Sequence, residues 1–312
     1  MDTKWTRRAL LGGGATLAGM GGLTFAAYRQ FPLFFEQYAR EMNLPVEPAP
    51  KAPNPKTWPD RGLHAAWLGH STVLVKVDGF TFLTDPVFST RAGLNFGPIT
   101  LGVKRRVEAA LRITDLPAVD LVLVSHAHMD HLDQPSLRKL EGNKTHLIMA
   151  PETSDLVRAG RYAAVKELRW DEEIRVGPAT IRAFAVNHWG ARMRTDTYRG
   201  YVGYLLEIGS RRILFAGDTA LTDSFHSLRR SREIDLAIMP IGAYNPWIRY
   251  HCTPEQAVKM ANDCGAGRLM PVHHQTFHLS REPLQEPIER FLAANRSTPG
   301  RVVLKDIGEE CH

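Results

Sequence analysis

Short apolar or alternating runs recur along the chain from about residue 60, and they predict β-strands. The first three runs are Leu63–Leu68, Thr72–Val77 and Phe80–Thr84, and Asp78-Gly79 is a typical hairpin turn between the last two. Further runs of this kind, each bounded by turn residues, are Val119–Val124, His146–Met149, Ala179–Val186, Val202–Ile208, Arg212–Phe215, Asp235–Met239 and Leu269–Val272. The sequence therefore predicts many short strands.

Helical patterns lie between and after the later strands. One helix is predicted from about Pro135 and another over residues 286–295. The clearest helix start has Thr253 as N-cap, Pro254 at the first helical position and Gln256 closing a capping box. Hairpins come first, and strands alternate with helices later. We therefore expect an α/β (α+β) fold, a four-layer αββα sandwich of two mixed β-sheets flanked by helices.

The N-terminal part of the chain has a different character. Arg7 and Arg8 precede an uncharged, glycine-rich apolar run, which is typical of a twin-arginine export signal. We interpret residues 1–27 as such a signal or membrane anchor and expect a periplasmic protein; the run is about long enough to cross a bilayer, so cleavage and retention both stay open. Residues 28–59 are expected to be an aromatic segment and a proline-rich linker, and residues 60–312 the catalytic domain.

Composition narrows the classes of partner. Hydrophobic residues make up 44% of the chain and charged residues 23%, which excludes wholesale disorder. The net charge of +6 favours an anionic substrate or a membrane surface without identifying either. No appended basic or aromatic-rich nucleic-acid module is visible, so no nucleic-acid partner is expected. The three cysteines lack a C-x-x-C spacing, so any metal would be held by histidine and carboxylate.

Histidine and aspartate gather directly after the predicted strands, where a rigid scaffold presents functional groups. Four of them form one H-x-H-x-D-H motif and three follow later strands: His126, His128, Asp130, His131, His188, Asp218 and His273. Imidazoles and carboxylates together suit Zn²⁺, with Fe or Mn as alternatives. The tight turn can serve two metals, His126 and His128 on one side and Asp130 and His131 on the other. We therefore predict two Zn²⁺ ions as cofactors.

Several longer stretches identify a family. They are W-L-G-H-S-T-V-L from Trp67, L-T-D-P-V-F-S from Leu83, L-P-A-V-D-L-V-L-V-S-H-A-H-M-D-H-L-D from Leu116, N-H-W from Asn187, F-A-G-D-T from Phe215, I-G-A-Y from Ile241, H-x-x-P-E-Q-A from His251 and V-H-H-Q-T-F-H-L-S-R-E-P from Val272. In this order they resemble the metallo-β-lactamase-fold hydrolase superfamily, and within it the branch of N-acylphosphatidylethanolamine-hydrolysing phospholipase D and its bacterial relatives. The resemblance covers nearly all of residues 60–285.

The resemblance implies a complete ligand set. One metal would be held by His126, His128 and His188, the other by Asp130, His131 and His273, and Asp218 would bridge both. At the last position His273 and His274 compete. Aligning the chain on Thr276-Phe277 makes His273 the ligand and places His274 where the branch usually has tryptophan; Gln275 replaces the glycine that usually follows.

The expected chemistry is hydrolysis by a hydroxide held between the two metals, which lower the pKa of water from 15.7 to roughly 7. Asp130 is expected to hold a metal and to orient this hydroxide. His251 is the candidate proton donor to the leaving group, although residues 245–250 before it depart from the branch pattern. For His70, a hydrogen bond to a ligand and a purely structural role stay open. His64, His146, His226, His278 and His312 are interpreted as background.

Two loop regions, residues 87–114 and 189–200, are predicted to wall the pocket. The first shows few strand signals, and both carry basic residues that suit a phosphodiester or another anion: Arg91, Lys104, Arg105, Arg106, Arg192, Arg194 and Arg199. The leading hypothesis is a phosphodiesterase acting on a phospholipid-like molecule, so we expect a small-molecule or lipid substrate. The alternative is a lactonase or another carboxylic ester or amide hydrolase. Redox work at an iron site and a metal-dependent binding protein are further hypotheses.

Overall fold

The computed structural model describes residues 41–312 except residue 98, and residues 45–312 form one compact unit. The predicted signal or anchor, residues 1–27, lies outside the described residues, as does the aromatic segment that follows it, residues 28–38. Within the described part of the chain, no helix combines the length and the apolar character needed to cross a membrane.

The proline-rich stretch lies against the rest of the compact unit. The backbone N–H of Glu47 donates to the carbonyl of Arg106, and the side chain of Trp58 is buried. Proline keeps this backbone from forming an α-helix, which leaves its polar groups free to pair with neighbouring segments. The compact unit therefore begins at Pro45, earlier than the predicted domain start near Asp60.

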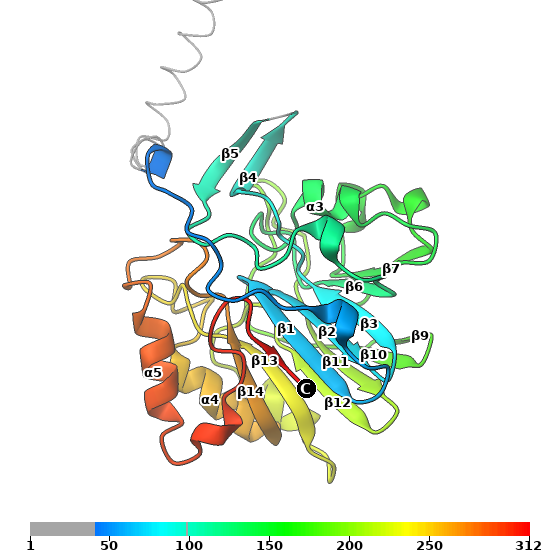
Figure 1. Cartoon of the computed structure of the whole chain (residues 1–312), viewed down its shortest axis with the longest axis vertical. Helices are drawn as coiled ribbons and strands as arrows, with labels where there is room; N and C mark the ends of the chain where they lie inside the picture. The colour runs from blue at the N-terminus through cyan, green and yellow to red at the C-terminus, as the bar shows by residue number, and fades with distance from the viewer. Residues whose placement is uncertain (1–40, 98) are drawn as a thin grey trace, which may run out of the picture. The chain divides into compact units, whose positions relative to one another are not determined.

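The first sheet has seven strands in the order β15-β1-β2-β3-β6-β7-β8 (Figure 1). In chain order these strands are β1 (Leu63–Gly69), β2 (Thr72–Val77), β3 (Phe80–Thr84), β6 (Leu121–Val124), β7 (His146–Met149), β8 (Ala164–Glu167) and β15 (Glu310–Cys311). The pairs β1–β2 and β2–β3 are antiparallel, whereas β3, β6, β7 and β8 run parallel to one another. The sheet is therefore mixed, and the hairpin predicted at Asp78-Gly79 is confirmed.

The second sheet has six strands in the order β14-β13-β12-β11-β10-β9. In chain order they are β9 (Glu173–Val176), β10 (Ala179–Phe184), β11 (Gly203–Ile208), β12 (Arg211–Phe215), β13 (Ile234–Pro240) and β14 (Ala266–Val272). Strands β9 to β12 pair antiparallel with their neighbours, whereas β12, β13 and β14 pair parallel. This sheet is mixed as well.

Two apolar cores separate the layers. One contains residues of both sheets, including Val75 and Leu123 from the first and Leu206 from the second. The other packs the second sheet against α4 (Pro254–Asp263) and α5 (Glu286–Ala294), which lie beside β13 and β14 (Figure 1). The connections of the first sheet carry α3 (Gln134–Lys139) and short 3-10 turns. The predicted αββα sandwich is confirmed, and so is the capping box between Thr253 and Gln256 that begins α4.

One prediction about residues 87–114 is wrong, because this stretch contains a hairpin that belongs to neither sheet. Strands β4 (Arg91–Phe96) and β5 (Ile99–Lys104) pair antiparallel, and Gly93 lies opposite Gly102. A Cβ atom on either glycine would overlap the backbone of the facing strand. These glycines permit a close approach of two strands, whereas in the sequence they suggest an irregular loop.

Candidate metal centre

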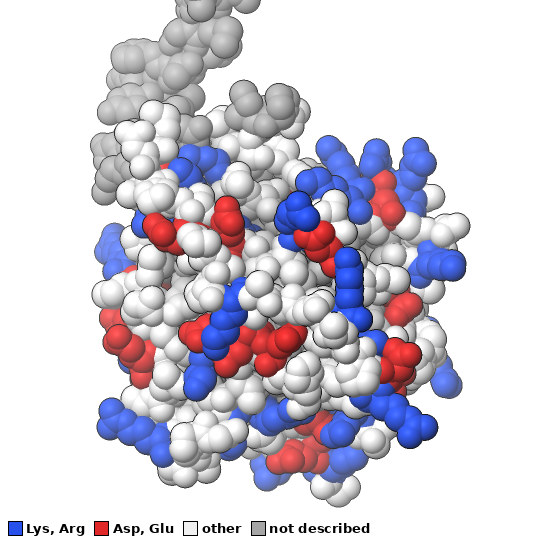
Figure 2. All heavy atoms as spheres, viewed as in Figure 1, with Lys and Arg blue, Asp and Glu red and all other residues white. Residues whose placement is uncertain are grey.

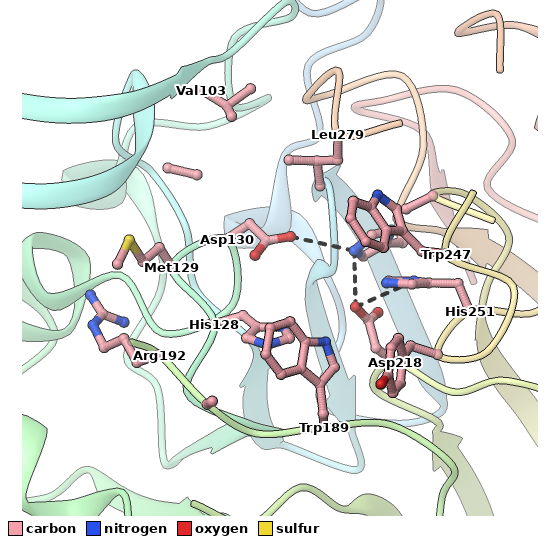
Figure 3. Close-up of a pocket in the computed structure, with 15 residues that line it drawn as sticks. Val103, His128, Met129, Asp130, Trp189, Arg192, Asp218, Trp247, His251 and Leu279 are labelled. Carbon is pink, nitrogen blue, oxygen red and sulfur yellow. Dashed lines mark ion pairs between the residues drawn. The ribbon is translucent and has the colours of Figure 1, made fainter. Parts of the chain in front are cut away.

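Every residue predicted as a metal ligand lies in one cluster at the end of the buried strands. The loop after β6 carries His126, His128, Asp130 and His131, and three other loops carry His188 beyond β10, Asp218 beyond β12 and His273 directly after β14. The preceding strands are fixed in the sheets, so the origin of each loop is fixed too. Figure 3 shows Asp130, Asp218 and His251 directed toward one another.

Three imidazole nitrogens form the first group of this cluster. Nε2 of His126 lies 2.9 Å from Nδ1 of His128, which lies 3.3 Å from Nε2 of His188. These three ring nitrogens come from two loops and lie close enough together for a single cation to be bound by all of them. This is the trio that the resemblance implies for the first metal.

The second group lies beside the first and shares an aspartate with it. Oδ2 of Asp130 is 3.4 Å from Nε2 of both His131 and His273. Oδ2 of Asp218 is 3.1 Å from these same two nitrogens, and 3.8 Å and 4.0 Å from Nε2 of His188 and His126. One carboxylate oxygen therefore lies between the two groups, where a ligand shared by two metals has to be.

Hydrogen bonds on the outer side of the rings fix which nitrogen faces the centre. Nδ1 of His188 donates to the carbonyl of Tyr250 at 2.8 Å, and Nδ1 of His131 donates to Oδ2 of Asp85 at 2.6 Å. The hydroxyl of Ser125 donates to the same Asp85 oxygen, so it accepts from Nδ1 of His126 at 2.9 Å. Each of these three rings therefore turns the lone pair of its Nε2 inward, as a metal ligand requires.

The charges of the cluster also suit cations. Burial would raise the pKa of Asp218, but His131 and His273 outweigh it and hold the pKa of this carboxyl well below its ordinary value. Burial would lower the pKa of His273, but Asp218 and Asp130 raise it to about 9. Asp218, which is buried, and Asp130, which is partly exposed, draw protons onto neighbouring rings that bound cations would displace. Nε2 of both His131 and His273 is buried without a hydrogen-bond partner among the described residues. The residues fit two cations.

His273 and His274 occupy different positions relative to the cluster. Nε2 of His273 lies 3.1 Å from Asp218, whereas the ring of His274 packs against Trp67 at 4.5 Å between centroids. The backbone of His273 has a φ of 62°, and its carbonyl oxygen approaches Gly242 so closely that a Cβ there would overlap it. Gly242 thus leaves room for the conformation that turns His273 into the cluster.

Sequence reasoning missed one residue of the cluster and left another open. Asp85 accepts from His131 and from the backbone and hydroxyl of Ser125, and it is completely buried. The signal that could have found it is its place directly after a predicted strand, as for the other carboxylates. His70, for which two roles were open, points its Nε2 at Oδ2 of Asp130, 2.9 Å away. It is a hydrogen-bond partner of a candidate ligand.

His251 lies beside Asp218 in the same cluster. Its Nδ1 is 3.8 Å from Oδ2 of Asp218, and its ring packs against those of His188 and His273. Burial lowers the pKa of His251 to about 3, so the ring is neutral at pH 7 and would have to gain a proton before it could act as the predicted proton donor. Its role as proton donor stays a prediction. The five background histidines are absent from the metal-binding groups found among the described residues.

A cleft of about 350 Å³ opens onto the cluster (Figure 3). Its floor includes His128, Asp130, Asp218, His251 and His273. Its walls are largely apolar and combine side chains from the β4–β5 hairpin with side chains from three loops: Ala92, Val103, Met129, Trp189, Ala191, Ala243, Trp247, Tyr250 and Leu279. The cluster is therefore open to a substrate that brings apolar surface with it.

The basic loops contribute less to this cleft than predicted. Of the seven basic residues named above, only Arg192 is among the described residues that line it. Arg105 is buried and donates to backbone carbonyls, including that of Ser89, and Arg199 is paired with Asp155 and Asp196. Arg192 uses Nη1 to donate to the carbonyls of Ala127 and Leu132. The face shown in Figure 2 has basic and acidic side chains interspersed.

The chain is similar to proteins of one family. Residues 81–274 match the model of the β-lactamase superfamily domain. A stretch of 264 residues is 34% identical to an uncharacterised protein of Mycobacterium tuberculosis and covers 78% of this chain and 69% of that protein. Over 250 residues the chain is 32% identical to N-acyl-phosphatidylethanolamine-hydrolyzing phospholipase D 1 of Caenorhabditis elegans. This match covers 74% of the chain and 69% of that enzyme. The solved structure of a metallo hydrolase of Ignicoccus hospitalis superposes with a TM-score of 0.60 at 20% identity. The superposition covers 80% of this chain and 97% of that one.

Fold, cluster and similarity together define a metal-dependent hydrolase with an αββα sandwich. The chain belongs to the metallo-β-lactamase-fold superfamily, in the branch that includes the N-acylphosphatidylethanolamine-hydrolysing phospholipases D.

Proposed function

We propose that the protein is a phosphodiesterase that hydrolyses a phospholipid-like substrate with two divalent cations, expected to be Zn²⁺. The observation that carries this proposal is the position of Asp218 between two groups of ring nitrogens at the floor of an apolar cleft. His126, His128 and His188 would hold one cation. Asp130, His131 and His273 would hold the other, with Asp218 shared.

The cations, when bound, lower the pKa of a water from 15.7 to roughly 7 and offset negative charge on a phosphoryl oxygen. The chain supplies the rest. Ser125, Asp85 and the Tyr250 carbonyl hold three rings in one orientation, so the ligands do not reorganise as the substrate arrives. Asp130, on the floor of the cleft, would accept a hydrogen bond from the attacking water. His251 would donate a hydrogen bond from its neutral ring to the departing oxygen, which takes up the proton that the attacking water releases.

Two further observations support a lipid-like diester over other hydrolase substrates. The cleft walls are apolar, which suits acyl chains better than a sugar or a nucleotide, and Arg192 supplies one cation beside them. The relatives in Caenorhabditis elegans and Saccharomyces cerevisiae are both named as hydrolases of N-acylphosphatidylethanolamine. Export by the twin-arginine route is part of the proposal, because it would place the protein beside a membrane; cell fractionation with an Arg7→Lys/Arg8→Lys variant tests it.

The decisive experiment measures metal content and turnover on the full chain. With two metals per chain, we expect hydrolysis of bis(p-nitrophenyl) phosphate and release of phosphatidic acid from N-acylphosphatidylethanolamine. His128→Ala should lose metal and activity, whereas His226→Ala, outside the cluster and more than half exposed, should keep both. A fully metallated protein that cleaves lactones or β-lactams but no phosphodiester would replace this proposal with the alternative one.

A further inference from the structure

One segment of the cleft wall combines ordered backbone with exposed aromatic side chains. Residues 245–250 (Asn245-Pro246-Trp247-Ile248-Arg249-Tyr250) lie between β13 and α4. The segment is held at both ends. The N–H of Asn245 donates to the buried carboxylate of Glu282, and the N–H groups of Tyr250 and His251 both donate to the carbonyl of Trp247. Its conformation is therefore fixed by hydrogen bonds of its own.

This ordered segment nevertheless exposes large apolar side chains. Trp247 is 51% exposed, Ile248 45% and Tyr250 37%, and both aromatic residues line the cleft. Single exposed apolar residues are common on protein surfaces and need no explanation. Here, however, the ring of Tyr250 lies 5.7 Å from that of Trp189, a third exposed aromatic residue of the cleft. The three rings thus line one cavity. Figure 3 shows two of them, those of Trp189 and Trp247.

Two of the three aromatic residues, Trp189 and Tyr250, contact candidate metal ligands directly. The ring of Trp189 packs edge-on against His128 at 4.9 Å between centroids. The carbonyl of Tyr250 accepts from Nδ1 of His188, so the residue that offers its ring to the cleft also orients a candidate ligand through its backbone. A group bound against these rings would lie next to whatever is held at the metals.

We propose that Trp189, Trp247 and Tyr250 form the subsite that binds the apolar group attached to the phosphate, and that Trp247 determines how strongly the protein selects for it. This inference rests on the proposed function, since it takes the phosphate to lie at the metal cluster. Stacked or edge-on aromatic faces bind alkyl chains and aryl rings alike. The chemistry of recognition is therefore apolar contact, and the source can be an acyl chain or an aromatic alcohol.

The test compares phosphate monoesters that differ only in their apolar group. Binding of ethyl, octyl and phenyl phosphate to the metal-loaded full chain is measured by calorimetry. We expect octyl or phenyl phosphate to bind at least about tenfold more tightly than ethyl phosphate. The ratio of the two dissociation constants, ethyl phosphate over the larger ester, should fall by about threefold or more in Trp247→Ala. The ester with the larger ratio identifies the alkyl or the aryl source. Trp247→Phe should restore most of the ratio.

Trp170→Ala is the matched control, because Trp170 is 46% exposed and lies outside the cleft. Metal content and melting temperature establish that each variant is folded. An equal ratio in the parent protein and Trp247→Ala would overturn the inference, even if phosphodiesters are hydrolysed. A ratio of dissociation constants that falls in Trp247→Ala but not in Trp170→Ala would support the subsite. If such a protein turned over no phosphodiester, only the proposed function would fail.

Discussion

Nδ1 of His131 lies 2.6 Å from Oδ2 of Asp85, and both side chains are completely buried. The same carboxylate accepts the backbone N–H and the hydroxyl of Ser125, whose oxygen in turn accepts from His126. His126 and His131 belong to different groups of the metal cluster. A single carboxylate that was not among the predicted ligands thus orients one ring in each group.

Asp85→Asn should therefore weaken metal binding at both positions. The amide has one accepting atom instead of two, so either His131 and the Ser125 hydroxyl or the backbone N–H of Ser125 loses its acceptor, and the network that orients both rings is disturbed. Loss of such outer hydrogen bonds typically lowers metal affinity by about 10–100-fold. Competition with a chromophoric chelator measures the affinity. The control is Asp120→Asn, because Asp120 accepts a backbone N–H from Thr81 in the same sheet and no ring nitrogen. Equal affinities in both variants would argue against this role.

The neighbouring histidines His273 and His274 should respond oppositely to substitution. His273→Ala removes a ring nitrogen next to Asp218 and should lower activity by at least about 100-fold, with loss of one metal per chain. His274→Phe keeps a ring against Trp67, and neither nitrogen of His274 has a hydrogen-bond partner among the described residues, so this variant should keep both metals. Metal analysis of the two purified variants is sufficient. A full metal complement in His273→Ala would refute the ligand assignment.

Gly242→Ala tests the close approach that positions His273. The new methyl group would overlap the carbonyl oxygen of His273, so the loop has to move. We expect a loss of about 1–3 kcal/mol in the free energy of unfolding and at least tenfold lower activity. Gly160→Ala is the matched control, since a Cβ there meets open space. Denaturant unfolding of the metal-free proteins measures stability, and indistinguishable stability of the two variants would contradict the prediction.

The sequence predicted the sheets, the capped helix and the ligand cluster because each leaves a local signal. Buried strands such as Leu121–Val124 are apolar runs, and the ligand residues follow them directly. Features that depend on contacts between distant segments left no such signal. Gly93 and Gly102 suggest a loop until they are placed opposite each other, and the ion pairs of Arg199 cannot be read from its own neighbourhood. Asp85 does follow a predicted strand, but its contacts with Ser125 and His131 form only once that strand lies beside β6.

Metal removal should destabilise the fold, because the site does not exist in the unfolded chain. Its candidate ligands come from four loops, and residues as far apart as His131 and His273 meet only after both sheets have formed. A cation at 100 times its dissociation constant contributes about 2.7 kcal/mol to stability by binding the folded state alone. For a domain of this size, that corresponds to a rise of roughly 5–10 °C in melting temperature. Calorimetry with and without a chelator measures it. In His128→Ala the difference should shrink, and an unchanged difference would mean that the stabilising cation binds elsewhere.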